Sequence, residues 1–289
     1  MGVYKSEAGK EKLQQHYEDY LHTLNFQVER RYVDTSFGKT HMLVAGPTDG
    51  KPLFIFQGGN CINPMTLSWF EPLIEKYRVY APDTIGHPGF SDETRVSAKD
   101  DSFAKWIKEL MDAVGVERCA MVGASYGAGI MMRMATFLPE RIDCAVLVSP
   151  AGIRMGSKLK MIKDVLVPMM LFTRTSDRKH LDKLTGNMSD HSMKDQDKTI
   201  IGDVFNHVKL DQDMPKMTEK KELENFHAPT LIIAGEKDVF FPHHKLEAAS
   251  NSIFSELKQF RSYEMGHFPS DTHLVEINQE IEAFLAEHY

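Results

Sequence analysis

Three side chains in this sequence could together cleave an acyl bond, and each comes just after a predicted strand. Ser125 stands within Gly-Ala-Ser-Tyr-Gly, Asp238 within Gly-Glu-Lys-Asp, and His267 directly after a glycine near the end of the chain. A serine hydroxyl becomes a strong nucleophile only when an imidazole accepts its proton and a carboxylate orients that imidazole. The chain order serine, acid, histidine therefore favours covalent acyl transfer, with Ser125 as nucleophile, His267 as base and Asp238 as the acid.

The segment around Ser125 predicts a strand, a tight turn and a helix. Apolar residues fill positions 119–122, and others recur at helical spacing after the turn, at Ile130, Met131 and Met134. Such a nucleophile elbow strains the backbone of the serine so that its side chain projects from the edge of the sheet. The two flanking glycines remove Cβ atoms that would collide there. A chain with 19 glycines matches so short a motif by chance too often for the motif to stand alone.

The other elements needed to position these residues are also predicted. Strand patterns alternate with helical ones along most of the chain, which favours an α/β fold with a mostly parallel sheet and helices on both faces. The first two strands favour an antiparallel hairpin at the sheet edge. The strands are expected near 26–34, 39–45, 52–56, 77–81, 119–122, 144–148, 230–234 and 256–260, and the clearest helices near 5–24, 103–114 and 272–286.

One interval is longer than a crossover between neighbouring strands requires. Residues 150–230 contain helical patterns but no clear strand. We expect a core domain made of residues 1–151 and 225–289. A helical cap, or lid, of residues 152–224 is expected to be inserted after the sixth strand.

With these motifs in place, the chain resembles the α/β-hydrolase superfamily, and in particular its serine esterase-like branch with a helical cap. The resemblance also includes Pro-Glu-Arg after the elbow helix and an Asp-Thr-Ile-Gly loop. It implies a Ser125–His267–Asp238 triad and an oxyanion hole formed by the backbone N–H groups of Tyr126 and Gly59. Many relatives carry His-Gly in that loop, where this chain has Gln57 followed by Gly58, and the Gln57 amide could support the loop instead.

Several residues compete for these roles. His243, His244 and His273 lie on predicted helices, and Glu236 precedes Asp238 at the wrong spacing for the resemblance, so structural or surface roles suit them better. A turn role is favoured for His87.

The substrate pocket is expected to include Gly58, Asn60, Met169, Met170 and Phe268. For Asn60 an ordinary turn role is the stronger interpretation, as is packing for the neighbouring Cys61. Eight of the 17 methionines lie between residues 152 and 224, where flexible, polarizable side chains could form an adaptable apolar surface. This surface favours small to medium, largely uncharged acyl substrates.

Composition narrows the class of partner. The net charge of −7 gives no electrostatic reason to expect nucleic acid, and no apolar run reaches membrane-spanning length. The three cysteines lack metal-ligand spacing, so we expect a reduced, cytoplasmic protein, a monomer or homodimer that acts on a small-molecule acyl substrate. No metal or organic cofactor is expected.

The predicted function is hydrolysis of a carboxylic ester or related acyl compound. A serine at the elbow argues against the dehalogenase and epoxide-hydrolase branches, which use aspartate there. Ala124 departs from the asparagine frequent in carbon–carbon bond hydrolases. That activity, a proline iminopeptidase-like activity, and a ligand-binding protein with little turnover remain alternatives.

Overall fold

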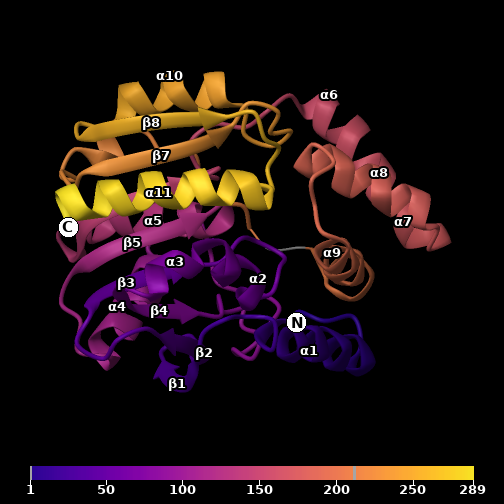
Figure 1. Cartoon of the computed structure of the whole chain (residues 1–289), viewed down its shortest axis with the longest axis horizontal. Coiled ribbons are helices and arrows are strands. Elements are labelled where there is room, and N and C mark those ends of the chain that lie inside the picture. Colours follow the sequence, from indigo (N-terminus) through magenta and orange to yellow (C-terminus); the bar gives the residue numbers. More distant parts are fainter. Residues whose placement is uncertain (1, 211–212) are drawn as a thin grey trace.

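The computed structural model describes residues 2–210 and 213–289, and its centre is a single eight-stranded sheet (Figure 1). The strands are arranged in the order β1-β2-β4-β3-β5-β6-β7-β8. Their bounds are β1 (Glu29–Thr35), β2 (Gly38–Ala45), β3 (Lys51–Phe56), β4 (Tyr77–Pro82), β5 (Cys119–Ala124), β6 (Ile142–Val148), β7 (Thr230–Gly235) and β8 (Leu257–Tyr263).

The sheet is parallel except at one edge. β1 and β2 form an antiparallel hairpin, and β2 is also antiparallel to β4, whereas β4, β3, β5, β6, β7 and β8 pair in parallel. Every residue of β5 and β7 is buried, as expected for strands covered on both faces. The predicted fold class and the predicted edge hairpin are confirmed.

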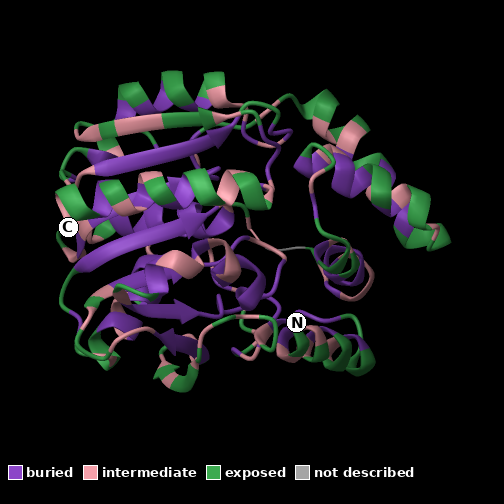
Figure 2. Cartoon of the chain, in the orientation of Figure 1, coloured by how far each residue is buried: buried purple, intermediate pink, exposed green. Residues whose placement is uncertain are grey.

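Helices cover both faces of the sheet and create two apolar cores (Figures 1 and 2). One core packs α4 (Ser102–Ala113), α5 (Tyr126–Phe137) and α10 (His243–Ile253) against the sheet. The other core packs α1 (Glu7–Leu21), α2 (Asn63–Leu67), the short turn η1 (Ser68–Phe70), α3 (Glu71–Ile74) and α11 (Asp271–His288) against the opposite face. No helix among the described residues is long and apolar enough to cross a membrane.

The segment between β6 and β7 is helical, and it lies at one end of the sheet (Figure 1). It contains α6 (Lys158–Met161), a π-helical turn η3 (Ile162–Leu166), α7 (Val167–Thr175), α8 (Arg178–Ser189), α9 (Asp195–His207) and a 3₁₀ turn η4 (Lys220–Leu223). Residues 211 and 212 of the predicted cap lie outside the described residues.

The amino-terminal helix is joined to this segment by charged side chains. Asp203 of α9 accepts from Lys12 Nζ at 2.8 Å and pairs with His16 Nε2 at 2.7 Å, both from α1. Gly9 lies so close to the His207 ring that a Cβ on Gly9 would be 2.8 Å from the His207 Cβ. α1 and α9, which both contribute residues to the second core, are thus also joined by charged side chains.

A buried carboxylate connects four further elements beneath the sheet edge. The side chain of Asp83 is fully buried, and its Oδ1 accepts from the Tyr17 hydroxyl at 2.7 Å and from Asn63 Nδ2 at 3.0 Å. Its Oδ2 accepts from the Phe90 backbone N–H at 2.8 Å and pairs with His41 Nδ1 at 3.0 Å. Both oxygens are therefore satisfied without water.

Asp83→Ala should lower the free energy of unfolding by about 3 kcal/mol, because several buried donors would lose their acceptor together. Denaturant unfolding followed by circular dichroism measures this loss. Asp34→Ala, which removes a carboxylate whose side chain is 88% exposed, is the control and should change stability by less than about 0.5 kcal/mol. Equal effects of the two substitutions would contradict a structural role for the Asp83 network.

Candidate active site

Ser125 lies at the turn between β5 and α5 with a strained backbone. Its φ is +50° and its ψ is −111°, a region that L-residues rarely occupy. The Ser125 N–H donates to the Val148 carbonyl at 2.8 Å, and its own carbonyl accepts from the Gly129 and Ala151 N–H groups, each at 3.1 Å. Hydrogen bonds on both sides thus hold the turn that points the hydroxyl out of the sheet.

The glycine at position 127 permits the close approach of α5 to β3. A Cβ on Gly127 would collide with the backbone carbonyl oxygens of Phe56 and Gln57. The first turn of α5 can therefore press against the loop after β3 only when residue 127 has no side chain.

His267 and Asp238 continue the line of hydrogen bonds that begins at Ser125. His267 Nε2 lies 2.9 Å from Ser125 Oγ, and His267 Nδ1 lies 2.8 Å from Asp238 Oδ2. The other oxygen of Asp238 accepts from the backbone N–H groups of Phe240 at 2.7 Å and Phe241 at 3.1 Å. A carboxylate that only accepts fixes the Nδ1–H tautomer of the imidazole, so that Nε2 presents its lone pair to the serine.

Three phenylalanine rings pack around the His267 imidazole, and a hydrogen bond to α8 holds the His267 backbone. The rings of Phe240, Phe241 and Phe268 lie 4.9, 5.5 and 5.6 Å from the His267 ring, centroid to centroid. The His267 backbone N–H donates to the Met188 carbonyl of α8 at 2.7 Å. Gly266 is needed here, because a Cβ would come within 2.7 Å of that carbonyl oxygen.

The loop after β3 faces the start of α5. A Cβ on Gly59 would lie 3.0 Å from the Tyr126 Cβ, so the two predicted oxyanion donors, the N–H groups of Gly59 and Tyr126, belong to adjacent segments. The Gly58 N–H is occupied, because it donates to Thr66 Oγ1 at 3.2 Å.

Gln57 holds this loop from beneath. Its side chain is fully buried; Nε2 donates to the Cys61 carbonyl at 2.9 Å, and Oε1 accepts from the Thr84 N–H at 3.3 Å. Gln57 precedes the Gly58–Asn60 turn and Cys61 follows it, so the Gln57 amide joins the two ends of the turn. The same amide also connects the turn to Thr84, in the loop after β4. These are the contacts that a loop-supporting role for Gln57 requires.

A small cavity of about 30 Å³ adjoins the serine and the imidazole. Of the predicted pocket residues, Gly58 and Phe268 line it, together with Gly59, Cys61, Met65, Thr66, Trp69, Ala124, Ser125 and His267. A space of this size holds one or two waters and no extended acyl chain.

Three predicted pocket residues do not line this cavity. Asn60 has a φ of +53° and occupies a turn, as its alternative interpretation held. Met170 is 42% exposed on α7, and Met169 packs partly buried against the small cluster around Val165 and Leu184. The methionines were predicted from composition, which carries no information on the direction in which each side chain points.

Thr66 and Trp69 are cavity residues that sequence reasoning missed. Both follow the Gly58–Asn60 turn within one short helical stretch, and that proximity in sequence was the signal available. The competing residues lie elsewhere: His243 and His244 face each other at the start of α10, and His273 Nδ1 lies 2.9 Å from Ser270 Oγ at the start of α11. Glu236 accepts a hydrogen bond from Ser262.

His87 is buried against Tyr126. Their ring centroids are 4.6 Å apart, and burial, followed by the charge of Arg95, lowers the pKa of His87 to about 3. Its backbone N–H donates to the Thr84 carbonyl at 3.0 Å, in agreement with the predicted turn. His87 is therefore a neutral packing residue behind Tyr126, the residue that follows Ser125. No cluster of three or more metal-ligating side chains occurs in residues 2–210 and 213–289.

Comparisons with known proteins agree with this architecture. The family model for the α/β-hydrolase fold matches residues 51–192. An uncharacterized carboxylesterase, nap, of Bacillus subtilis is 27% identical over 239 residues, which are 77% of this chain and 75% of that protein. Carboxylesterase YbfK of the same species is 24% identical over 276 residues, 94% of this chain and 92% of that protein.

Solved structures extend the similarity to the whole fold. The crystal structure of carboxylesterase YbfK has a TM-score of 0.80 at 21% identity and covers 98% of this chain and 100% of its own. A meta-cleavage product hydrolase from Pseudomonas fluorescens has a TM-score of 0.72 at 20% identity, with coverage of 90% and 98%. The chain therefore has the α/β-hydrolase fold, and its similarity to the carboxylesterases supports a hydrolase of the esterase-like kind.

The three buried thiols should be unreactive in the folded protein. Burial raises the pKa of Cys61, which lines the cavity, to about 11 and that of Cys144 to about 12; the pKa of Cys119 is also raised by burial. A thiol becomes a thiolate only as the pH rises through its pKa, so at pH 8 roughly one Cys61 in a thousand is reactive. Native protein should react negligibly with a disulfide reagent at pH 8, whereas unfolded protein should titrate all three thiols.

Asn251→Cys, which adds a thiol at an exposed position of α10, is the positive control and should react at once. Rapid modification of Cys61 in the unsubstituted protein, located by peptide mapping, would show that the cavity is open to solvent at that thiol.

Proposed function

We propose that this protein is a serine carboxylesterase that hydrolyses a small-molecule ester or related acyl compound through an acyl-enzyme on Ser125. The observation that carries the proposal is the continuous line of hydrogen bonds from Ser125 Oγ through the His267 ring to Asp238. Each distance is within the range needed for direct proton transfer or orientation. The carboxylesterase relatives support the reaction class.

The first half-reaction uses these groups in sequence. Ser125 Oγ attacks the ester carbonyl carbon while its proton passes to His267 Nε2. The carbonyl oxygen becomes an oxyanion, which the N–H groups of Gly59 and Tyr126 stabilise. When the intermediate collapses, the bond to the leaving oxygen breaks, that oxygen takes the proton from Nε2, and the alcohol departs.

Water completes the cycle. His267 Nε2 accepts a proton from a water molecule that attacks the acyl-enzyme, and it then returns the proton to Ser125 Oγ as the carboxylic acid leaves. The Asp238 carboxylate keeps the ring orientation and stabilises the imidazolium in both halves. The chain's own residues account for every proton in this sequence.

We also propose that residues 152–224 act as a cap on a core of residues 1–151 and 225–289. The hydrogen bond from the His267 N–H to Met188 supports this division, because it places the end of α8 directly behind the base. The Lys237–Asp190 ion pair, at 2.8 Å, joins the same two regions.

Ser125→Ala and His267→Ala should each lower kcat on p-nitrophenyl acetate by about 10⁴-fold or more, because either change removes the nucleophile–base pair. Asp238→Asn should reduce kcat severely. His273→Ala, a histidine at a helix start away from Ser125, is the control and should keep most activity. Steady-state kinetics measure these effects.

A fluorophosphonate probe separates this proposal from a ligand-binding role without turnover. The probe should label Ser125 in folded protein and fail to label Ser125→Ala. Loss of activity in His273→Ala with retention in His267→Ala would show that the base is misassigned.

Gln57→Met should lower kcat by roughly 10- to 100-fold with a smaller change in KM, because the oxyanion loop loses its bridge while the side-chain volume is kept. Gln27→Met, at the surface before β1, provides a matched control without this contact. An unchanged kcat in Gln57→Met would mean that packing alone holds the loop.

A further inference from the structure

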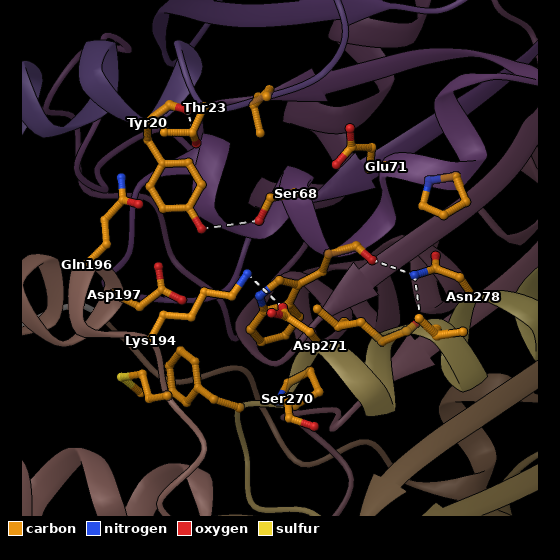
Figure 3. Close-up of a pocket in the computed structure, with 18 of the residues that line it drawn as sticks. Tyr20, Thr23, Ser68, Glu71, Lys194, Gln196, Asp197, Ser270, Asp271 and Asn278 are labelled. Carbon is orange, nitrogen blue, oxygen red and sulfur yellow. Dashed lines mark hydrogen bonds and ion pairs between the residues drawn. The ribbon is translucent and has the colours of Figure 1, made fainter.

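A second, larger cavity opens on the outer side of the Ser125 site. Its volume is about 660 Å³, within the range of small-molecule binding sites (Figure 3). Its walls come from the end of α1, from η1 and α3, from the start of α9 and from the start of α11. None of the hydrogen-bonded catalytic groups proposed above lies in these walls.

Two aromatic side chains separate this outer cleft from the inner cavity. Trp69 and Phe268 line both spaces. Their ring centroids are 5.7 Å apart with an interplanar angle of 85°, so they meet edge to face. The inner cavity measures only about 30 Å³, and the outer cleft, which shares Trp69 and Phe268 with it, is the neighbouring space available to a larger ester.

The outer cleft is acidic. Glu71, Glu75, Asp197 and Asp271 line it, and Lys194 is the one lysine or arginine among its described lining residues. Lys194 Nζ lies 2.6 Å from Asp271 Oδ1, so its charge is matched by that carboxylate. Among the described residues, Glu71, Glu75 and Asp197 form no ion pair with a lysine or arginine of the cleft, although the charge of Lys194 also acts on Asp197.

Asp197 is unlike the other three because it is buried. Only 8% of the residue is exposed, and no described residue hydrogen-bonds to its Oδ1. The carboxylate points into the space between Tyr20 and Lys194 (Figure 3). Burial raises the pKa of Asp197 to about 6, and a hydrogen bond from Tyr20 opposes that rise. At neutral pH a mainly ionised carboxylate is thus buried with one acceptor unused, which is costly unless a donor arrives.

We propose that the outer cleft binds an ammonium group on the part of the substrate remote from the ester, with Asp197 as its hydrogen-bond acceptor and Trp69 and Phe268 flanking the chain that connects the two. Glu71 and Glu75 at the rim add to the attraction for a cation. The preferred substrates are therefore aminoalkyl esters, and the uncharged substrates favoured by the methionine-rich composition are the poorer ones. This inference rests on the proposed esterase function for the position of the ester.

Binding to the Ser125→Ala variant tests this inference without turnover. The probes are matched pairs in which an ammonium replaces a terminal methyl, at chain lengths of about four to eight carbons. Methyl 6-aminohexanoate against methyl heptanoate carries the charge on the acyl side. In the second pair, 6-aminohexyl acetate is compared with heptyl acetate. Here the ammonium group is on the alcohol side of the ester. Isothermal titration calorimetry gives the dissociation constants.

In at least one series the ammonium ester should bind about tenfold or more tightly than its neutral partner at pH 7.5, because a hydrogen bond to a charged group is among the stronger ones. Adding Asp197→Asn should reduce that ratio to about one. Adding Asp195→Asn should preserve it, because Asp195 lies on the same helix with its side chain 77% exposed. Glu71→Gln, a change at a half-buried residue of the cleft wall, should reduce the ratio only two- to threefold, roughly the effect of a partly solvated charge.

Equal binding of both esters at every length, or an unchanged ratio in Asp197→Asn, overturns the inference. If Asp197→Asn fails to fold, as judged by its thermal melt, two other measurements test the inference. The Ser125→Ala parent must still prefer the ammonium ester, and Glu71→Gln must reduce that preference. Failure here is distinct from failure of the esterase proposal. In the first case the unsubstituted protein still hydrolyses p-nitrophenyl acetate and labels with fluorophosphonate; in the second case it does neither.

Discussion

The backbone at Ser125 is the constraint on which the site depends. A φ of +50° for a residue with a side chain costs on the order of 1–3 kcal/mol, so the surrounding structure must impose it. β5 and β6 clamp the turn from one side, and α5 can begin at once only because Gly127 lets its first turn touch the end of β3. The same close contact brings the Gly59 segment opposite Tyr126. One strained residue therefore aligns both the hydroxyl and the two backbone groups proposed to receive the oxyanion.

Buried carboxylates at the carboxyl edge of the sheet then fix the loops around that residue. Asp238 is buried and accepts from two backbone N–H groups as well as from His267, and Asp83 is buried with donors from four segments. A buried charge is stable only when all of its oxygens are hydrogen-bonded, so each of these aspartates holds a single loop arrangement. Asp197 is also buried, although slightly less so, and its Oδ1 has no hydrogen-bond partner among the described residues. Asp83 and Asp238 therefore stabilise the fold through their hydrogen bonds, whereas Asp197 retains an acceptor oxygen that a ligand can use.

Sequence patterns predict the parts of this molecule that depend on local rules. Alternating strand and helix patterns gave the fold class, because each crossover buries its own apolar face against the sheet. Gly-Ala-Ser-Tyr-Gly predicted the turn at Ser125, since the steric need for glycine is local. The outer cleft was not predictable in this way, because Tyr20, Trp69 and Asp197 come together only when α1, η1 and α9 pack. Likewise, Met169 and Met170 were assigned from composition, whereas their exposure follows from how α7 lies on its neighbours.

Several hydrogen bonds and ion pairs attach the helical segment to the rest of the chain. The His267 N–H bonds to Met188, Lys237 pairs with Asp190, and Asp203 is held by Lys12 and His16. Swinging the segment outward as one body would break these contacts together and would pull on the backbone of His267 itself. Rotation of the half-buried Trp69 and Phe268 side chains disturbs only an edge-to-face ring contact, worth about 1 kcal/mol beyond its area. Joining the two cavities by side-chain rotation would therefore keep the contacts that hold His267, whereas moving the whole segment would break them.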